Sequence, residues 1–279
     1  MVKSLQVEFS ASDILFLIET VDPQLVSRID TIKDDPVLIE GMLDNEVGKL
    51  FQRIMLMRED RIMARITPRF LFEVLLRAAI KGLEGRRYTV ERTACQKIPV
   101  FDSSEVVRFF GNRAVLRYLV DMLSSFTRTD SFTVSRRVRA GVWRKVRFSD
   151  MDVDSLVRLC DAVDEEYRFG IYKRIADLCL FILGMFPEYV ISEFRYPLGG
   201  QARPKIFGKW VRSAEDYETE GRRFYHLAGE HRDAVMLDLA EVLGQLHDNF
   251  NLARKPLNYI SENLVLFKRQ RLFPSISAE

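Results

Sequence analysis

The segment TPRFLFEVLLRAAIKGLEG, residues 67–85, decides the fold class of this chain. Thr67 is a favoured helix cap and Pro68 a favoured first-turn residue, so together they predict that a helix begins here. Its apolar residues recur at helical spacing: Phe70, Leu71, Val74, Leu75 and Ala78. The glycines at positions 82 and 85 mark its end. We therefore predict a helix with one apolar face turned inward.

Comparable patterns predict helices over most of the remaining chain. One begins at Ser12, and a second runs from Pro36 to Met57. Two more follow residues 102–105 and are separated at 111–112. Others cover about 152–186, with an interruption at 168–170, and then 213–250, and Pro256 opens a last helix that ends at 268–271.

Two segments have residue patterns that are typical of β-strands instead. Residues 88–101 suggest short strands, and Pro99 places the second of them at a sheet edge. In residues 131–148, apolar residues are interleaved with arginines on both sides of Ala140-Gly141. This pattern predicts a hairpin. The predicted fold class is therefore mainly α, a multi-helix globular protein with minor β-hairpins near 88–101 and 131–148.

Length and composition allow more than one domain arrangement. With 279 residues, 47% hydrophobic and 29% charged, the chain can build one large core or two smaller ones. We divide it into an N-terminal helical region, 1–127, a basic hairpin, 128–148, and a C-terminal helical region, 149–279. One compact domain overall is the alternative.

Several classes of protein are disfavoured by the sequence. The net charge of +2 gives no overall attraction to nucleic acid or to a membrane, so any such binding must be local. Glu8 and Asp13 lie where a signal peptide would carry its apolar stretch, which disfavours export. The apolar run 178–186 is too short to span a bilayer. Three cysteines without metal or disulfide spacing indicate free thiols. We expect a cytoplasmic protein without a membrane partner.

Four segments carry a resemblance: TPRFLFEVLLR at 67–77, PVFD at 99–102, YLVDMLSSFTR at 118–128, and RIADLCLFILGMFP at 174–187. In these the chain resembles an uncharacterised bacterial family of helical proteins, and the likeness covers most of the sequence. The resemblance implies a bacterial cytosolic protein. It transfers no activity, cofactor or catalytic residue to this chain.

Charge is segregated around the predicted hairpin. Seven basic residues face the single acidic Asp130: Arg128, Arg136, Arg137, Arg139, Arg144, Lys145 and Arg147. The sign then reverses, because seven acidic residues follow against Arg158 alone: Asp150, Asp152, Asp154, Asp161, Asp164, Glu165 and Glu166.

Two interpretations of this pattern stay open. In one, the hairpin binds phosphates, because arginine matches phosphate oxygens bidentately and a two-stranded ribbon fits a duplex groove. Its candidate nucleic-acid or anion-binding residues are Arg136, Arg137, Arg139, Arg144, Lys145 and Arg147. In the other, favoured on charge pattern alone, the hairpin is neutralised by the acidic segment or solvates an exposed edge.

The order of elements from 68 to 148 is also that of a winged helix. Its recognition helix would be residues 113–125, which are mostly apolar and offer mainly Arg113 and Arg117. We interpret it as a core helix instead. A second basic stretch, 194–212, interleaves aromatic residues and suits unpaired bases, but we favour a long loop whose aromatic residues pack on the body.

No pattern specifies catalysis or a cofactor. His226 and His231 are five residues apart, which is poor spacing for two metal ligands on a helix, and no nucleotide-loop or nucleophile motif occurs. We predict no metal and no cofactor. The functional hypotheses, in order of preference, are a non-enzymatic interaction or regulatory protein, a nucleic-acid-binding protein using the basic hairpin, and an enzyme with a noncontiguous site. Partners are then another protein, including a second copy of this chain, or nucleic acid.

Overall fold

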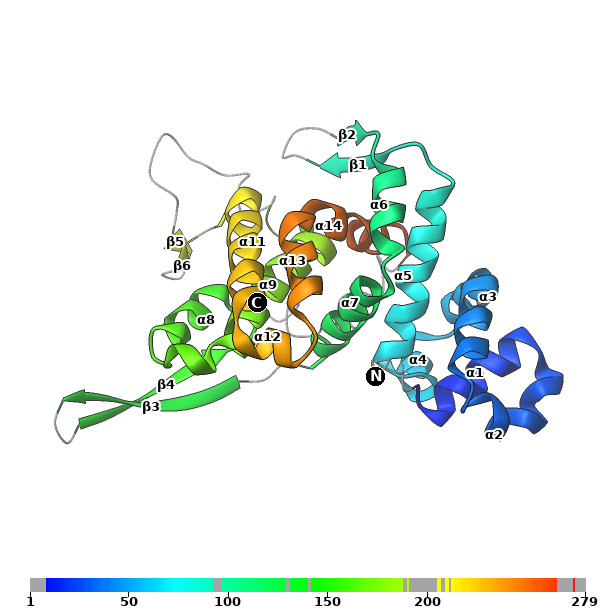
Figure 1. Ribbon diagram of the computed structural model, residues 1–279, viewed down its shortest axis with the longest axis horizontal. Helices are drawn as coiled ribbons and strands as arrows, with labels where there is room; N and C mark the ends of the chain where they lie inside the picture. Colours follow the sequence, from blue (N-terminus) through cyan, green and yellow to red (C-terminus); the bar gives the residue numbers. More distant parts are fainter. Residues whose placement is uncertain are drawn as a thin grey trace.

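A computed structural model describes residues 9–92, 97–128, 131–139, 142–187, 190, 205–206, 209–210, 212–264 and 273. For the strands of the 131–148 hairpin it describes the backbone. The chain is a multi-helix protein in which two-stranded antiparallel hairpins are the only sheets of the described residues (Figure 1). The prediction of a mainly α fold with minor hairpins is confirmed.

The N-terminal part packs short helices against one long one. It contains α1 (Ala11–Val21), a 3-10 helix (Pro23–Arg28), α2 (Ile29–Ile32), α3 (Pro36–Leu56), α4 (Glu59–Arg65) and α5 (Pro68–Glu84). The cap of α1 is Ser10, two residues before the predicted start, because Ser10 and Asp13 form a reciprocal capping box. Asp13 also accepts hydrogen bonds from the backbone N and the Oγ1 of Thr67, at 2.7 and 2.8 Å. One carboxylate therefore joins the N-terminal ends of α1 and α5.

The middle of the chain holds two hairpins and two helices. β1 (Thr89–Arg92) pairs with β2 (Lys97–Val100), and α6 (Ser103–Phe110) and α7 (Arg113–Ser125) follow. β3 (Ser131–Arg139) then pairs with β4 (Val142–Ser149) in antiparallel register. β1 and β2 lie near the ends of α5 and α6 at the top of the view, whereas β3 and β4 extend from the body at the lower left (Figure 1).

The C-terminal part begins with α8 (Val153–Cys160), a 3-10 turn (Glu165–Tyr167) and α9 (Phe169–Met185). Two short strands, β5 (Lys205–Ile206) and β6 (Lys209–Trp210), precede α11 (Ala214–Glu230), α12 (Arg232–Met236), α13 (Ala240–Asp248), α14 (Phe250–Tyr259) and a π-helix (Ile260–Leu264). The helical pattern predicted over 213–250 is divided among α11, α12 and α13, because His231 has extended backbone and caps α12. Pro256 lies inside α14 and does not open a helix.

A continuous apolar core joins the helices of both halves of the chain. It extends from Ile14 to Phe273, and α9 lies at its centre, with Leu178, Leu180 and Phe181 wholly buried. Within the described part of the chain, no helix has the length and apolar character that crossing a bilayer requires. The fold thus gives a helical body with a continuous core, from which the β3–β4 hairpin extends.

Polar groups buried in this core are matched to one another. Asp177 of α9 accepts hydrogen bonds from the hydroxyls of Tyr118 and Tyr225, at 2.7 and 2.9 Å, and pairs with Lys173 at 2.8 Å. Burial, followed by the charge of Asp177, raises the pKa of both tyrosines well above their usual value. This cluster fixes α7, α9 and α11 relative to one another.

Candidate nucleic-acid interface

The β3–β4 hairpin carries all six basic residues of the predicted binding site. Arg136, Arg137 and Arg139 belong to β3, whereas Arg144, Lys145 and Arg147 belong to β4; their side chains lie outside the described residues. The hairpin forms a two-stranded ribbon that projects from the helical body (Figure 1). Hereafter it is called the ribbon.

The register of the ribbon distributes the basic positions over both of its faces. Arg136 is paired with Arg144, and a residue further along β3, Arg137 is paired with Trp143. Because successive residues of a strand face opposite sides, these neighbouring pairs belong to opposite faces. Like charges directly opposite each other destabilise a sheet, so the pair Arg136 and Arg144 works against the stability of the ribbon.

Arg174 of α9 holds both ends of the ribbon at its root. Its guanidinium donates hydrogen bonds to Oγ of Ser125 at 2.8 Å and to Oδ2 of Asp150 at 2.6 Å. It also lies over the ring of Phe126, 3.8 Å from the centroid. Ser125 and Phe126 precede β3, whereas Asp150 follows β4. One arginine therefore clamps the entry and the exit of the ribbon.

Further contacts join β4 to α8. The backbone N of Ser149 donates to Oγ of Ser155 at 3.2 Å, and the side chain of Asp152 caps α8. Asp154 forms an ion pair with Arg212 at 2.6 Å. The ribbon is thus anchored on two helices by hydrogen bonds and ion pairs, although it extends beyond them.

Several acidic residues of the segment 150–166 take part in these contacts. Asp150 pairs with Arg174 and Asp154 with Arg212, and neither arginine belongs to the ribbon. The remaining four acidic residues are exposed on the turn after α8: Asp161, Asp164, Glu165 and Glu166. The acidic segment is therefore divided between the root of the ribbon and a separate surface.

A cavity of about 450 Å³ opens beside the root of the ribbon. Leu156, Leu159 and Ile171 supply its apolar wall, and Ser125, Asp150 and Arg174 line its polar end. The polar groups of the cavity are those of the root clamp. The cavity therefore belongs to the anchoring region of the ribbon.

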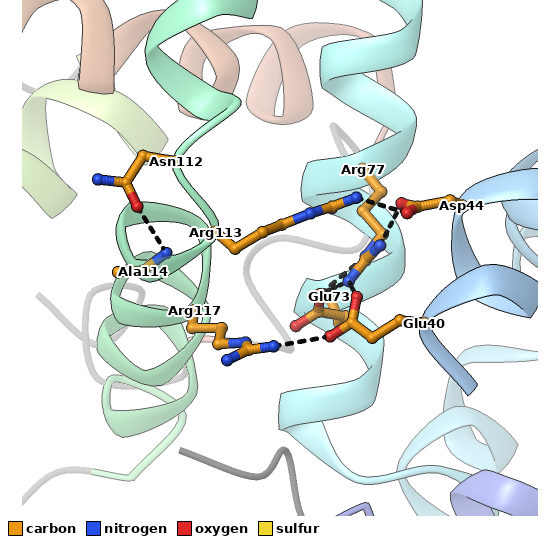
Figure 2. Close-up of polar contacts among 8 residues, drawn as sticks. All are labelled: Glu40, Asp44, Glu73, Arg77, Asn112, Arg113, Ala114 and Arg117. Atoms are coloured by element: carbon orange, nitrogen blue, oxygen red, sulfur yellow. Dashed lines mark hydrogen bonds and ion pairs between the residues drawn. The ribbon is translucent and has the colours of Figure 1, made fainter. Parts of the chain in front are cut away.

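The winged-helix alternative fails at α7, whose apolar residues are buried. Arg113 and Arg117, the polar groups that α7 would offer to a duplex, pair with Asp44 and Glu40 of α3 (Figure 2). Both arginines therefore take part in an ion-pair network that joins α3, α5 and α7. The interpretation of α7 as a core helix is confirmed.

Arg77 of α5 is the centre of this network and is almost fully buried (Figure 2). It pairs with Glu73 on its own helix and with Glu40 and Asp44 on α3. Burial raises the pKa of Glu73, and the charge of Arg77 only partly offsets this effect. For Glu40, the hydrogen bonds and charges of Arg77 and Arg117 outweigh burial and lower the pKa.

Residues considered for other chemistry are separated or buried. The rings of His226 and His247 lie 5.1 Å apart, but His231 caps α12 elsewhere. Across the described ranges, no group of three His, Cys, Asp or Glu is placed to hold a metal ion. Cys160 and Cys179 are free and buried, and Cys95 lies outside the described residues. Most of the second basic stretch, 194–212, also lies outside them.

The fold and this site define a mainly α-helical protein with a root-clamped basic ribbon. Comparison with protein-family models, curated proteins and solved structures finds no match. The resemblance to a bacterial family of helical proteins therefore stays a prediction.

Proposed function

We propose that this protein binds nucleic acid through the ribbon, without performing chemistry on it. The observation that carries the proposal is a projecting ribbon with basic residues on both faces, including the paired positions Arg136 and Arg144. A duplex groove admits a two-stranded ribbon, and the phosphates compensate the repulsion between neighbouring arginines. Binding of this kind fits a non-enzymatic regulatory protein.

The contacts at the root support a ribbon that is held at a definite place on the helical body. Asp150 and Asp154 pair with arginines of the helical body, and Arg174 fixes the ribbon in a direction that leads away from it. A positioned ribbon approaches a duplex with little loss of conformational freedom, which favours affinity. Arg174 is therefore a positioning residue in this proposal and does not touch the nucleic acid.

The test removes charge from the ribbon while keeping long polar side chains. In the variant R137Q/R139Q/R144Q/R147Q, we expect duplex affinity to fall sharply at low salt. Removing one arginine that neutralises a phosphate lowers the slope of log affinity against log salt by about 0.9 on duplex DNA. Fluorescence anisotropy of labelled duplex and single strands, titrated at several salt concentrations, measures both quantities.

A matched control makes the same charge change away from the ribbon. Arg28, Arg61, Arg87 and Arg108 are exposed on the helical body, and their joint replacement by Gln should change the affinity and the salt slope much less. Equal effects of the two variants would show attraction without a ribbon site. Wild-type protein that binds neither duplex nor single strand at low salt would refute the proposal.

A further inference from the structure

An exposed apolar patch lies on α12 and on the 3-10 turn Glu165–Tyr167 that precedes α9, and the proposed function does not use it. Val235, Met236 and Leu237 are 70, 79 and 56% exposed, and Tyr167 is 66% exposed. Three consecutive large apolar side chains in water are unfavourable and indicate a docking surface. We call these four residues the apolar patch.

The backbone holds this patch in an unusual conformation. Asp238 has φ of 58°, the only positive φ at a non-glycine residue of the described chain. The turn is closed by hydrogen bonds from the backbone N of Leu239 to O of Ala234, at 2.8 Å, and from N of Asp238 to O of Val235, at 3.2 Å. This C-terminal motif ends α12 and keeps the three apolar residues together at the surface.

Acidic residues border the patch on the side of the 3-10 turn. His231 contacts the backbone O of Glu165 through Nε2 at 3.2 Å and packs against the ring of Phe169 at 5.7 Å. Val235 is one helical turn, about 6 Å, from His231 along α12. The acidic turn after α8 is thereby held beside the patch; its exposed residues are Asp161, Asp164, Glu165 and Glu166.

None of these four acidic residues forms an ion pair with another residue of the described ranges. Residues 161–166 contain four acidic side chains and no basic one. A surface that combines an apolar centre with an acidic border fits a basic segment that also carries apolar residues. The ribbon has this composition, with Val142 and Trp143 among its arginines.

We propose that the apolar patch and its acidic border bind the ribbon of a second copy of this chain. The far part of the ribbon leads away from α12, so it does not cover the patch of its own chain (Figure 1). Opposite charges then draw the two copies together, and the apolar side chains are removed from water. Because patch and ribbon are different surfaces, the contact is head-to-tail, and a complex of two chains keeps one ribbon and one patch free.

The same ribbon cannot occupy a patch and a nucleic acid at once, so the two binding events compete. Each contact between two copies then covers one ribbon, and nucleic acid that binds this ribbon separates the two copies. The self-association itself does not depend on the proposed function. Both are therefore tested separately.

Sedimentation velocity over a range of protein concentrations tests the contact without nucleic acid. Wild-type protein should associate as its concentration rises, and high salt should weaken the association because it screens the charges. The patch variant V235N/M236N and the ribbon variant R137Q/R139Q/R144Q/R147Q should each weaken association by about tenfold or more. Neutralising the border with D164N/E165Q/E166Q should weaken it mainly at low salt.

Mixing the patch variant with the ribbon variant gives the decisive result. Each lacks a different half of the contact, so the mixture should form 1:1 complexes at protein concentrations where either variant alone is monomeric. V37N/L56N is the matched control, because Val37 and Leu56 are 81 and 88% exposed on α3, away from the patch; it should associate like wild type. Monomeric wild-type protein at every concentration, or variants that associate unchanged, would overturn the proposal, whatever the result with nucleic acid.

Discussion

Replacing Arg77 by Met tests the ion-pair network that holds α3 against α5 and α7. Met has an unbranched chain like the aliphatic part of Arg, but it lacks the positive charge that pairs with Glu40, Asp44 and Glu73 (Figure 2). Glu73 is 0% exposed, and its Oε2 has no hydrogen-bond partner among the described residues. The variant therefore leaves a buried carboxylate without its counterion, which costs about 3–5 kcal/mol of unfolding free energy.

The loss should depend on pH in a definite direction. Burial already raises the pKa of Glu73, and removal of the opposing charge of Arg77 raises it further. A carboxyl with a raised pKa in the folded state favours folding when protonated, so stability falls as pH rises from its unfolded pKa through its folded pKa. Arg77 also helps to lower the pKa of Glu40. Without Arg77, ionised Glu40 stabilises the folded protein less at pH values above its unfolded pKa. Both effects make the loss larger at neutral than at acidic pH.

Guanidinium unfolding at about pH 5 and about pH 8 compares an acidic with a mildly alkaline condition and measures these effects. The double variant E73Q/R77M should recover part of the loss at pH 8, because Gln places no charge in the core. A matched single variant, K49M, removes an exposed partner of Glu46 and should cost no more than about 1 kcal/mol. An R77M protein as stable as wild type, or equally destabilised at both pH values, would refute this account of the network.

Three other results follow from the structure. Replacing Arg174 by Met should speed amide hydrogen exchange in residues 131–149 and weaken duplex binding, because the two ends of the ribbon lose their shared hydrogen-bond donor; unchanged exchange would contradict its role as a clamp. Replacing Asp177 by Asn should lower the free energy of unfolding by about 1–3 kcal/mol, measured by guanidinium titration. Burial raises the pKa of Cys160 to about 11 and raises that of Cys179, so in a C95S variant both thiols should react with a disulfide reagent near pH 7 only after unfolding.

Capping residues and the spacing of apolar residues predicted many of the helices from the sequence. The helix from Pro68 to Glu84 follows from its Thr67 cap and from apolar spacing, because both signals act within a few residues. The same signals predicted helical structure over 213–250 but did not locate the breaks between α11, α12 and α13. There the apolar spacing continues across the break at His231, because α11 and α13 face the same core. The spacing of apolar residues identifies the buried face of a helix. It does not show where the backbone changes direction.

The contacts that build the site join residues far apart in the sequence, and local patterns do not contain them. Arg77 meets Glu40 and Asp44, which precede it by 37 and 33 residues. Arg174 meets Asp150 and Ser125 across 24 and 49 residues. In the sequence, Arg174 is one basic residue at the start of an apolar helix, so its role as a clamp became visible only when the helices were packed.

Charge segregation could locate the ribbon in the sequence, but it could not decide between a solvent-facing ribbon and an internally paired one. That choice depends on which arginines the acidic segment meets in space. A two-stranded ribbon by itself is only marginally stable, and pairing Arg136 with Arg144 lowers its stability further. Arg174 and Ser155 anchor its root to the body, where the fold can compensate this loss. The proposed polyanion partner would offset the remaining repulsion, because its phosphates would lie between the arginines and neutralise their charges.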